Sequence, residues 1–183
     1  GMPLSLPLSV LVSDDNQQAI DVTFYGRPYE ADGEDFTLIV LPDTQYYSKF
    51  FPDIFYAQVQ WIVDNQASQN ILFVTHLGDI VDSGDWTGAD TEWINASNAI
   101  TLLETNGASI PYGLAVGNHD QAVSGDPDST TAHYNAYFGI THFSGRPYYG
   151  GLFGSDNDNH YELYNYGGLK FIIIHIESAE DPN

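Results

Sequence analysis

Cysteine is absent from this chain of 183 residues, and lysine and arginine together number only 4. The absence of cysteine excludes disulfides, thiolate metal sites and a cysteine nucleophile. The scarcity of cations excludes sequence-independent binding to nucleic acid or to an anionic bilayer, because such binding neutralises many phosphates at once. No apolar run reaches the roughly 18 residues that a membrane-spanning helix needs. A phosphate group bound by this chain would therefore need metal ions.

Acidic and aromatic residues, in contrast, are abundant. The chain has 25 aspartates and glutamates, a formal net charge of −21, and 13 tyrosines and 10 phenylalanines. Hydrophobic residues make up 43% of it, which is too high a share for an intrinsically disordered protein. The composition predicts a folded domain whose acidic residues lie on its surface and at its sites.

The first 29 residues are predicted to form a separate β-hairpin. Two short β-like runs, 8–12 and 20–25, flank a polar loop, which is the pattern of a hairpin. They resemble the last two strands of Ig-like or cadherin-like repeats in large bacterial surface proteins. This resemblance implies a larger multidomain chain, exported by a bacterium to the periplasm, the cell surface or the medium. The alternative is a hairpin packed on the main domain, residues 30–183.

Strand and helix patterns alternate in the main domain. Three apolar runs of strand length and two segments of helical periodicity occur in turn, namely strands at 36–41, 71–75 and 112–116 and helices at 52–63 and 90–105. This βαβαβ order predicts a parallel sheet with right-handed crossovers and strands buried on both faces. After a long loop stretch at 124–159, broken by a short helix at 131–138, strands at 161–166 and 169–175 form a predicted hairpin.

Four side chains able to bind a metal stand where predicted strands end. They are Asp43, Asp79, Asn118 and His175. In open α/β sheets this edge is where ligands bind, because the strand-to-loop turns converge there. Asp and Asn are also common in turns and at helix N-caps, but the four residues together indicate a metal site.

Two of these strand ends lie in longer motifs. Residues 78–82 read Gly-Asp-Ile-Val-Asp and residues 117–120 read Gly-Asn-His-Asp, and Asp79 and Asn118 are 39 positions apart. They resemble the GDxxD and GNHD motifs of the calcineurin-like metallophosphoesterases, and residues 43–45, Asp-Thr-Gln, resemble that family's first motif, Asp-x-His. The resemblance implies an α/β fold, an α/β/β/α sandwich with a buried, largely parallel sheet, of which this chain holds the first part.

The resemblance also implies a centre of two divalent metal ions, with Mn, Fe or Zn as the candidates. Asp79 would bridge the two ions, since a carboxylate has two oxygens and the charge to hold both. Asp43 and Gln45 would bind the first ion, and Asn118 and His175 the second. A metal-bound hydroxide would then attack the phosphorus of a small phosphorylated substrate, either a monoester or a diester.

The catalytic residues implied by the family are His119 and Asp120. His119 would face the substrate and stabilise its phosphoryl oxygens or protonate the leaving alkoxide, and Asp120 would orient His119. Asp82 would support the metal ligands by hydrogen bonding. In the long loop, Arg146 and His142 are candidate substrate-binding residues, with a salt bridge within the loop as the alternative for Arg146.

The remaining histidines have plainer interpretations. His76 is predicted to pack at a strand end, and His133 and His160 to be structural or solvated. The run of Asp and Asn at 155–159 lacks the spacing of an EF-hand and is predicted to be a solvated turn rather than a calcium loop.

Two departures from the family pattern keep other functions open. Gln45 replaces the usual histidine, and its amide oxygen is a weaker ligand than imidazole. The closing Gly-His-x-His motif is absent, so we expect a fragment of a catalytic domain, and whether it is active alone stays open. The alternative function is a degenerate, non-catalytic surface module. A haloacid-dehalogenase-type phosphatase with Asp43 as nucleophile is disfavoured, because that chemistry needs a carboxylate at position 45.

Overall fold

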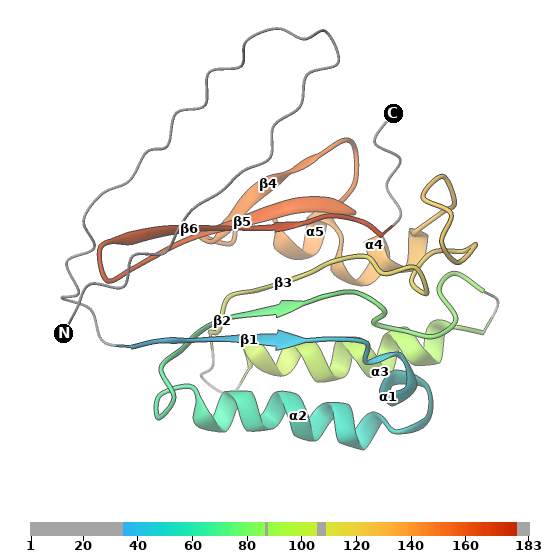
Figure 1. Cartoon of the computed structure of the whole chain (residues 1–183). Coiled ribbons are helices and arrows are strands. Elements are labelled where there is room, and N and C mark those ends of the chain that lie inside the picture. The colour runs from blue at the N-terminus through green and yellow to red at the C-terminus, as the bar shows by residue number, and fades with distance from the viewer. Residues whose placement is uncertain (1–34, 87, 106–108, 179–183) are drawn as a thin grey trace, which may run out of the picture. The chain divides into compact units, whose positions relative to one another are not determined.

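A computed structural model describes residues 35–86, 88–105 and 109–178 (Figure 1). The hairpin predicted over residues 1–29 lies outside this part of the chain. Among the described helices, none has the length and apolar character needed to cross a bilayer.

The first half of the described chain forms a parallel sheet with helices. Its strands pair in the order β1-β2-β3, all parallel. The elements are β1 (Thr37–Leu41), α1 (Gln45–Phe50), α2 (Pro52–Asn65), β2 (Ile71–His76), α3 (Asp90–Ile100), the 3-10 helix η1 (Thr101–Glu104) and β3 (Tyr112–Leu114). The predicted βαβαβ order is therefore confirmed. The helix predicted at 90–105 is α3 followed by η1.

The second half forms an antiparallel sheet in the order β4-β5-β6. Its elements are α4 (Ala132–Phe138), α5 (Ile140–Phe143), β4 (Tyr149–Phe153), β5 (Asn159–Tyr166) and β6 (Leu169–His175). The predicted helix at 131–138 and the predicted hairpin of β5 and β6 are confirmed. Strand β4 was not predicted, because Gly150 and Gly151 weaken its strand pattern. Gly150 is required there, since a Cβ on it would lie 2.2 Å from the ring of Tyr161.

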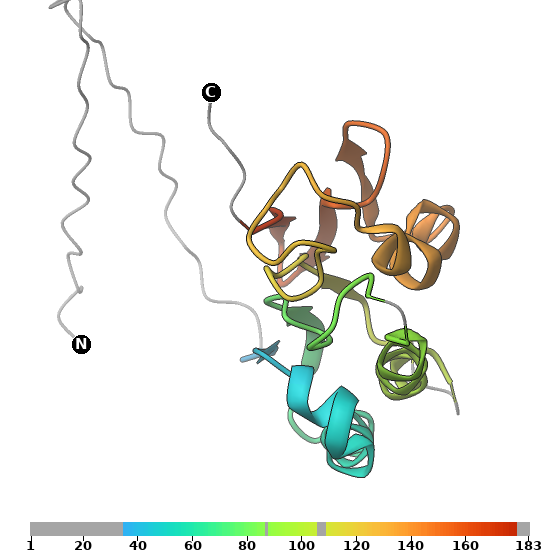
Figure 2. The same ribbon diagram turned by 90° about the vertical axis from the view of Figure 1, so that its right-hand side faces the viewer.

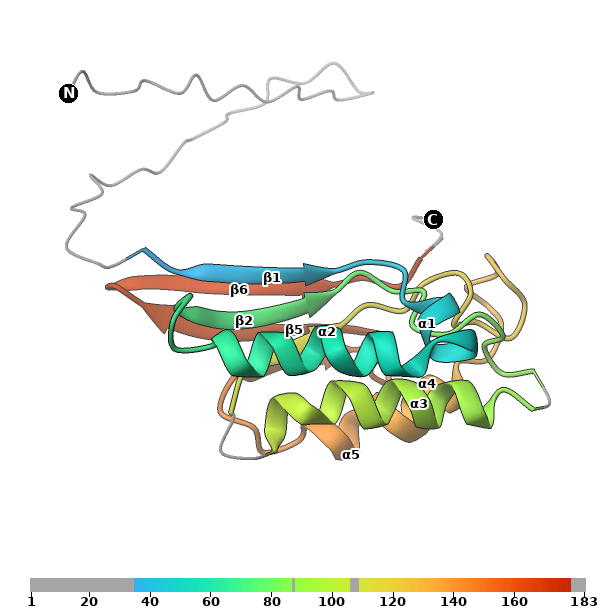
Figure 3. The same ribbon diagram turned by 90° about the horizontal axis from the view of Figure 1, so that it is seen from below.

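The described elements lie in three layers. Helices α2 and α3 lie side by side on one face of the parallel sheet (Figure 3), and the antiparallel sheet lies on the other face (Figure 1). Strand β2 contributes to both interfaces because its side chains alternate. Phe73 stacks on Tyr164 of β5 with ring centroids 5.5 Å apart, whereas the ring of His76 lies 6.3 Å from that of Phe55 in α2.

Parts of both sheets are more exposed than the sequence predicts. Leu38 and Val40 on β1 are 39% and 52% exposed, so β1 is not buried on both faces. On β6, Ile172 and Ile174 are 58% and 61% exposed. The structure thus shows the α/β/β layers of the predicted sandwich, and no helix in the described part of the chain covers the outer face of the antiparallel sheet.

We expect Phe73→Ala to lower the free energy of unfolding by about 3–5 kcal/mol, because it removes a fully buried ring between the two sheets. Phe153→Ala is the matched control: this ring is 83% exposed, and its loss should cost less than about 0.5 kcal/mol. Urea unfolding measures both. Equal effects of the two substitutions would contradict the packing of the sheets described here.

Candidate functional site

Three loops leave the parallel sheet at the same edge. The pairing of Leu41 with His76 and of His76 with Leu114 sets the strands in register, so Asp43, Asp79 and Asn118 all follow at the carboxyl ends. Figure 2 looks onto this end of the molecule. The structure therefore brings the first three predicted metal ligands to one side of the sheet, as parallel strands require.

Both aspartates lie at strained points of the backbone. Asp43 has a φ of 45° and Asp79 a φ of 52°, a conformation that costs free energy for residues other than glycine and is concentrated at functional sites. The GDxxD and GNHD loops also approach closely through their glycines. A Cβ on Gly78 would lie 2.6 Å from the Gly117 nitrogen, and one on Gly117 would lie 2.2 Å from Asp79 Oδ1. Any side chain at these glycines would push the two motifs apart.

His76 anchors the loop that carries Asp79. Its Nδ1 accepts a hydrogen bond from the Gly78 N–H at 3.2 Å, so its Nε2 carries the proton and donates to Thr44 Oγ1 at 2.9 Å. Thr44 in turn donates to the Ile80 carbonyl at 3.3 Å. Burial lowers the pKa of His76 to about 3, and His175 adds to this effect. The neutral ring is a packing residue at the strand end, as predicted.

Asp120 is fully buried and holds the two motif loops together. Its Oδ1 accepts hydrogen bonds from the N–H groups of Ile80 and Val81 at 2.8 and 3.0 Å, and its Oδ2 accepts one from Gly117 at 2.8 Å. Burial raises the pKa of this carboxyl to about 8, while the three N–H donors act to lower it. These partners are all backbone groups, whereas the predicted role of Asp120 was to orient His119.

Asp82 contacts His119 instead. The Nδ1 of His119 lies 3.1 Å from the Asp82 carbonyl oxygen and 3.6 Å from its Oδ1. Lys49 donates to Asp82 Oδ2 at 2.5 Å, and this bond is the main cause of the raised pKa of Lys49. Glu92 accepts from the N–H of Asp82 at 2.8 Å. Sequence reasoning missed Lys49 and Glu92, and the scarcity of cations is a signal that could have drawn attention to Lys49.

The donor atoms at the strand ends fit divalent cations. Asp79 Oδ1 accepts the N–H of His119 at 2.9 Å, which leaves Oδ2 free of hydrogen bonds from the described residues. Gln45 Oε1 is buried without a hydrogen-bond partner. Asn118 uses its amide N–H to bind Ser124 at 2.9 Å, so its Oδ1 remains available. Carboxylate and amide oxygens of this kind suit hard and borderline divalent metals.

His175 does not share contacts with these residues. It is 3% exposed and lies deeper in the fold, with Nε2 2.8 Å from Thr75 Oγ1 and Nδ1 2.9 Å from Glu162 Oε2. Within the described residues, three His, Asp or Glu ligand atoms lie within 4.8 Å of one another only in the group His160, Glu162 and His175. No hydrogen bond or ion pair among the described residues joins His175 to Asn118, with which it was expected to share a metal ion.

Arg146 and His142 are likewise remote from the strand-end loops. Arg146 forms an ion pair with Glu104 at 2.8 Å, and His142 Nε2 lies 3.0 Å from the same carboxylate. Both also contact Tyr112, which begins β3, whereas Asn118 follows the opposite end of that strand. Arg146 therefore forms a salt bridge, as in the alternative interpretation, but its partner Glu104 lies in η1 and not within the long loop.

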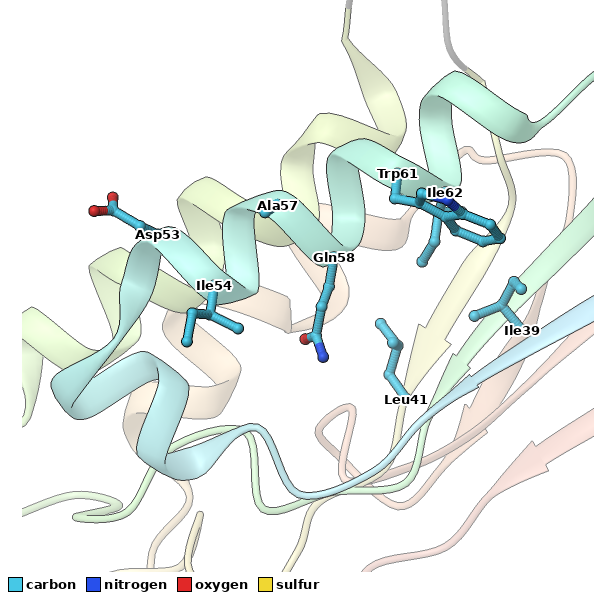
Figure 4. Close-up of a pocket in the computed structure, with 8 residues that line it drawn as sticks. All are labelled: Ile39, Leu41, Asp53, Ile54, Ala57, Gln58, Trp61 and Ile62. Atoms are coloured by element: carbon cyan, nitrogen blue, oxygen red, sulfur yellow. The ribbon is translucent and has the colours of Figure 1, made fainter.

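An apolar groove lies between α2 and β1 (Figure 4). Its volume is about 590 Å³, and its lining residues are Ile39, Leu41, Asp53, Ile54, Ala57, Gln58, Trp61 and Ile62. None of them belongs to the three motifs. The groove therefore adds nothing to the strand-end site.

We expect Asp120→Asn to lower the free energy of unfolding by about 1–3 kcal/mol, because the amide NH₂ of asparagine would face at least one buried backbone N–H that now has an acceptor. Asp128→Asn, at an exposed position, is the control and should change stability little. Chemical denaturation compares the two variants. An unchanged stability in Asp120→Asn would show that the carboxylate does not hold the loops.

Stability should also fall on acidification because of His76. The unfolded state takes up a proton near pH 6.5 and the folded state only near pH 3, so protonation between these values favours unfolding. The free energy of unfolding should decrease by up to about 1.4 kcal/mol per pH unit for this one group. His76→Gln should show a shallower decrease between pH 6.5 and 5. Parallel curves for the variant and the parent chain would refute this role of His76.

Comparison with known proteins agrees with the geometry of the motifs. Residues 36–182 match the calcineurin-like phosphoesterase family. YvnB of Bacillus subtilis (strain 168), itself an uncharacterized protein, is 38% identical to this chain over 142 residues, which are 77% of this chain and 10% of YvnB. The chain thus spans about a tenth of the length of this curated relative. With three motifs at one sheet edge and a family match over most of its length, the chain belongs to the calcineurin-like phosphoesterases.

Proposed function

We propose that this protein is a metal-dependent phosphoester hydrolase that acts on a small phosphorylated substrate, a monoester or a diester, through two divalent cations. The observation that carries the proposal is the convergence of the three motif loops at one edge of the sheet, with strained backbone at Asp43 and Asp79. Family membership supports it. So does the charge of the chain, since 4 basic side chains leave few other ways to neutralise a phosphate.

Asp43, Gln45, Asp79 and Asn118 would hold the cations, which are Mn, Fe or Zn in this proposal. When bound, the cations would withdraw charge from the phosphoryl oxygens and lower the pKa of water. Asp79 is suited to share its carboxylate, because one oxygen is fixed by the His119 N–H and the other has no partner among the described residues. His175 is left out of this set, because its Nδ1 faces Glu162 and its Nε2 faces Thr75.

His119 is the proposed proton donor. A carbonyl oxygen can only accept a hydrogen bond, so the contact with the Asp82 carbonyl places a proton on Nδ1. The other nitrogen, Nε2, is then directed away from this anchor on a side chain that is 36% exposed. In the protonated ring, Nε2 can give its proton to the leaving alkoxide. Asp82, held by Lys49, positions the ring.

Gln45 favours one alternative, a non-catalytic binding module that keeps the fold. A family member with a weaker ligand at this position binds its first cation less tightly, and activity is sensitive to that loss. We also propose that the domain works within a larger, exported bacterial chain. The small share of YvnB that the match covers supports the first part of this proposal, and the resemblance of residues 1–29 to surface-protein repeats motivates the second.

We expect His119→Ala to lower kcat by about 10²- to 10⁴-fold, the usual loss of a general acid, on p-nitrophenyl phosphate or bis-p-nitrophenyl phosphate with Mn²⁺. His133→Ala is the matched control, because His133 lies on α4 and pairs with Asp85 and Asp90, which follow the GDxxD motif in the chain. Its activity should stay near that of the parent chain. A parent chain that binds two metal ions and turns over neither substrate would favour the binding module.

A further inference from the structure

A second cluster of potential metal ligands lies between the two sheets. His160 and Glu162 are two residues apart on β5, so both point to the same face, and His175 on β6 pairs directly with His160. The two imidazole rings stack with centroids 4.8 Å apart. Exposure of the three residues is 2%, 0% and 3%. The cluster is therefore inside the protein, sealed from solvent.

His160 and Glu162 face each other through atoms that carry no proton when the His160 ring is neutral. His160 Nδ1 lies 2.7 Å from the Asn157 carbonyl oxygen, which can only accept, so Nδ1 carries the proton of the neutral ring. The lone pair of Nε2 then faces Glu162 Oε1 at 3.2 Å. An imidazole lone pair and a carboxylate oxygen repel each other at this distance unless a cation or a proton lies between them.

Four polar atoms converge on this point without a hydrogen bond. They are His160 Nε2, both carboxylate oxygens of Glu162, and His175 Nδ1. The distances from the nitrogens to the oxygens, 3.2 and 2.9 Å, are short. The angles at these contacts, however, do not suit a hydrogen bond. Four buried and unpaired polar atoms would be costly to leave in this state. A positively charged group that accepts electron pairs, such as a metal cation, would satisfy all four atoms.

We propose that His160, Glu162 and His175 bind one divalent cation, and that the cation is zinc. Two imidazole nitrogens and a carboxylate are a common zinc donor set. In a tetrahedral zinc site with such bonds, neighbouring donor atoms lie about 3.3 Å apart, close to the two distances seen here. The site is separate from the strand-end loops and does not rest on the function proposed above.

The surroundings of the cluster are those of a metal site. Histidines that bind a metal almost always donate their other N–H to a carbonyl, carboxylate or hydroxyl. The Asn157 carbonyl does so for His160, and Thr75 Oγ1 lies 2.8 Å from Nε2 of His175. The lack of a side chain at Gly113 also leaves room for the cluster. A Cβ there would lie 2.5 Å from His175 Cε1 and 2.6 Å from Glu162 Oε1. Only glycine fits on β3 at this point.

The proposed zinc is structural, because no substrate can reach a cluster that is buried to this degree. It would join β5 and β6 to each other and fix them against β2 and β3, through Thr75 and Gly113. Binding free energy at such a site adds to the free energy of folding. The result would be a rigid joint between the two sheets.

The test removes the strand-end carboxylates first, so that the two metal sites are read separately. The double variant Asp43→Asn/Asp79→Asn, dialysed against a weak chelator, should keep about one zinc per chain by mass spectrometry, the single site proposed here. Its Co²⁺ form should show a visible d–d band. Adding Glu162→Gln should abolish both, whereas adding Glu104→Gln, a control on a partly buried carboxylate outside the cluster, should change neither.

Thermal unfolding gives an independent reading. Zinc should raise the Tm of the double variant by about 5 °C or more at saturating concentration, and should not raise it after Glu162→Gln. The proposal would be overturned if the double variant is folded by circular dichroism but retains no metal and shows no Tm shift with zinc. In that case a proton shared between the imidazoles and Glu162 would stabilise the cluster. This outcome stands even where the Glu162→Gln chain fails to fold. The same outcome does not bear on the proposed hydrolase function, because the double variant lacks the two carboxylates of the strand-end site.

Discussion

The carboxylate of Asp120 connects the two loops on which the strand-end site depends. Its oxygens take N–H groups from both motifs, at Ile80, Val81 and Gly117. A carboxyl group buried in this way is stable only while its donors stay in place, because a buried polar group without partners is costly in the interior. The positions of Asp79 and of the following GNHD loop are thus coupled through one side chain that need not touch a substrate.

Local patterns were enough to predict much of the fold and part of the site. The parallel strands follow from apolar runs of strand length, and the helix from Pro52 follows from apolar residues at helical spacing, of which Phe55 and Val59 are fully buried. Asp43 and Asp79 could be placed at one sheet edge because strand ends of a parallel sheet must meet there. These inferences need no knowledge of how distant loops pack.

Sequence patterns were of least help for side chains whose partners are far away in the sequence. Arg146 pairs with Glu104, 42 positions earlier, and no local pattern indicates such a pair. Asp120 directly follows His119 in the chain, yet its carboxylate turns to the backbone of the neighbouring loop. His175, at the end of β6, points between the sheets. Side chains alternate between the two faces along β6, so His175 lies on the same inner face as Ile173.

The exposed isoleucines of β6 bear on how this acidic chain behaves in solution. Ile172 and Ile174 are each about three-fifths exposed, on a strand at the edge of its sheet among the described strands, and Ile176 directly after the strand is exposed to the same degree. An apolar edge strand is a template for pairing with another chain. The net charge of −21 opposes such contacts between copies by mutual repulsion, and that protection is screened by salt. The surplus of acid therefore opposes pairing between copies of the chain most strongly at low ionic strength.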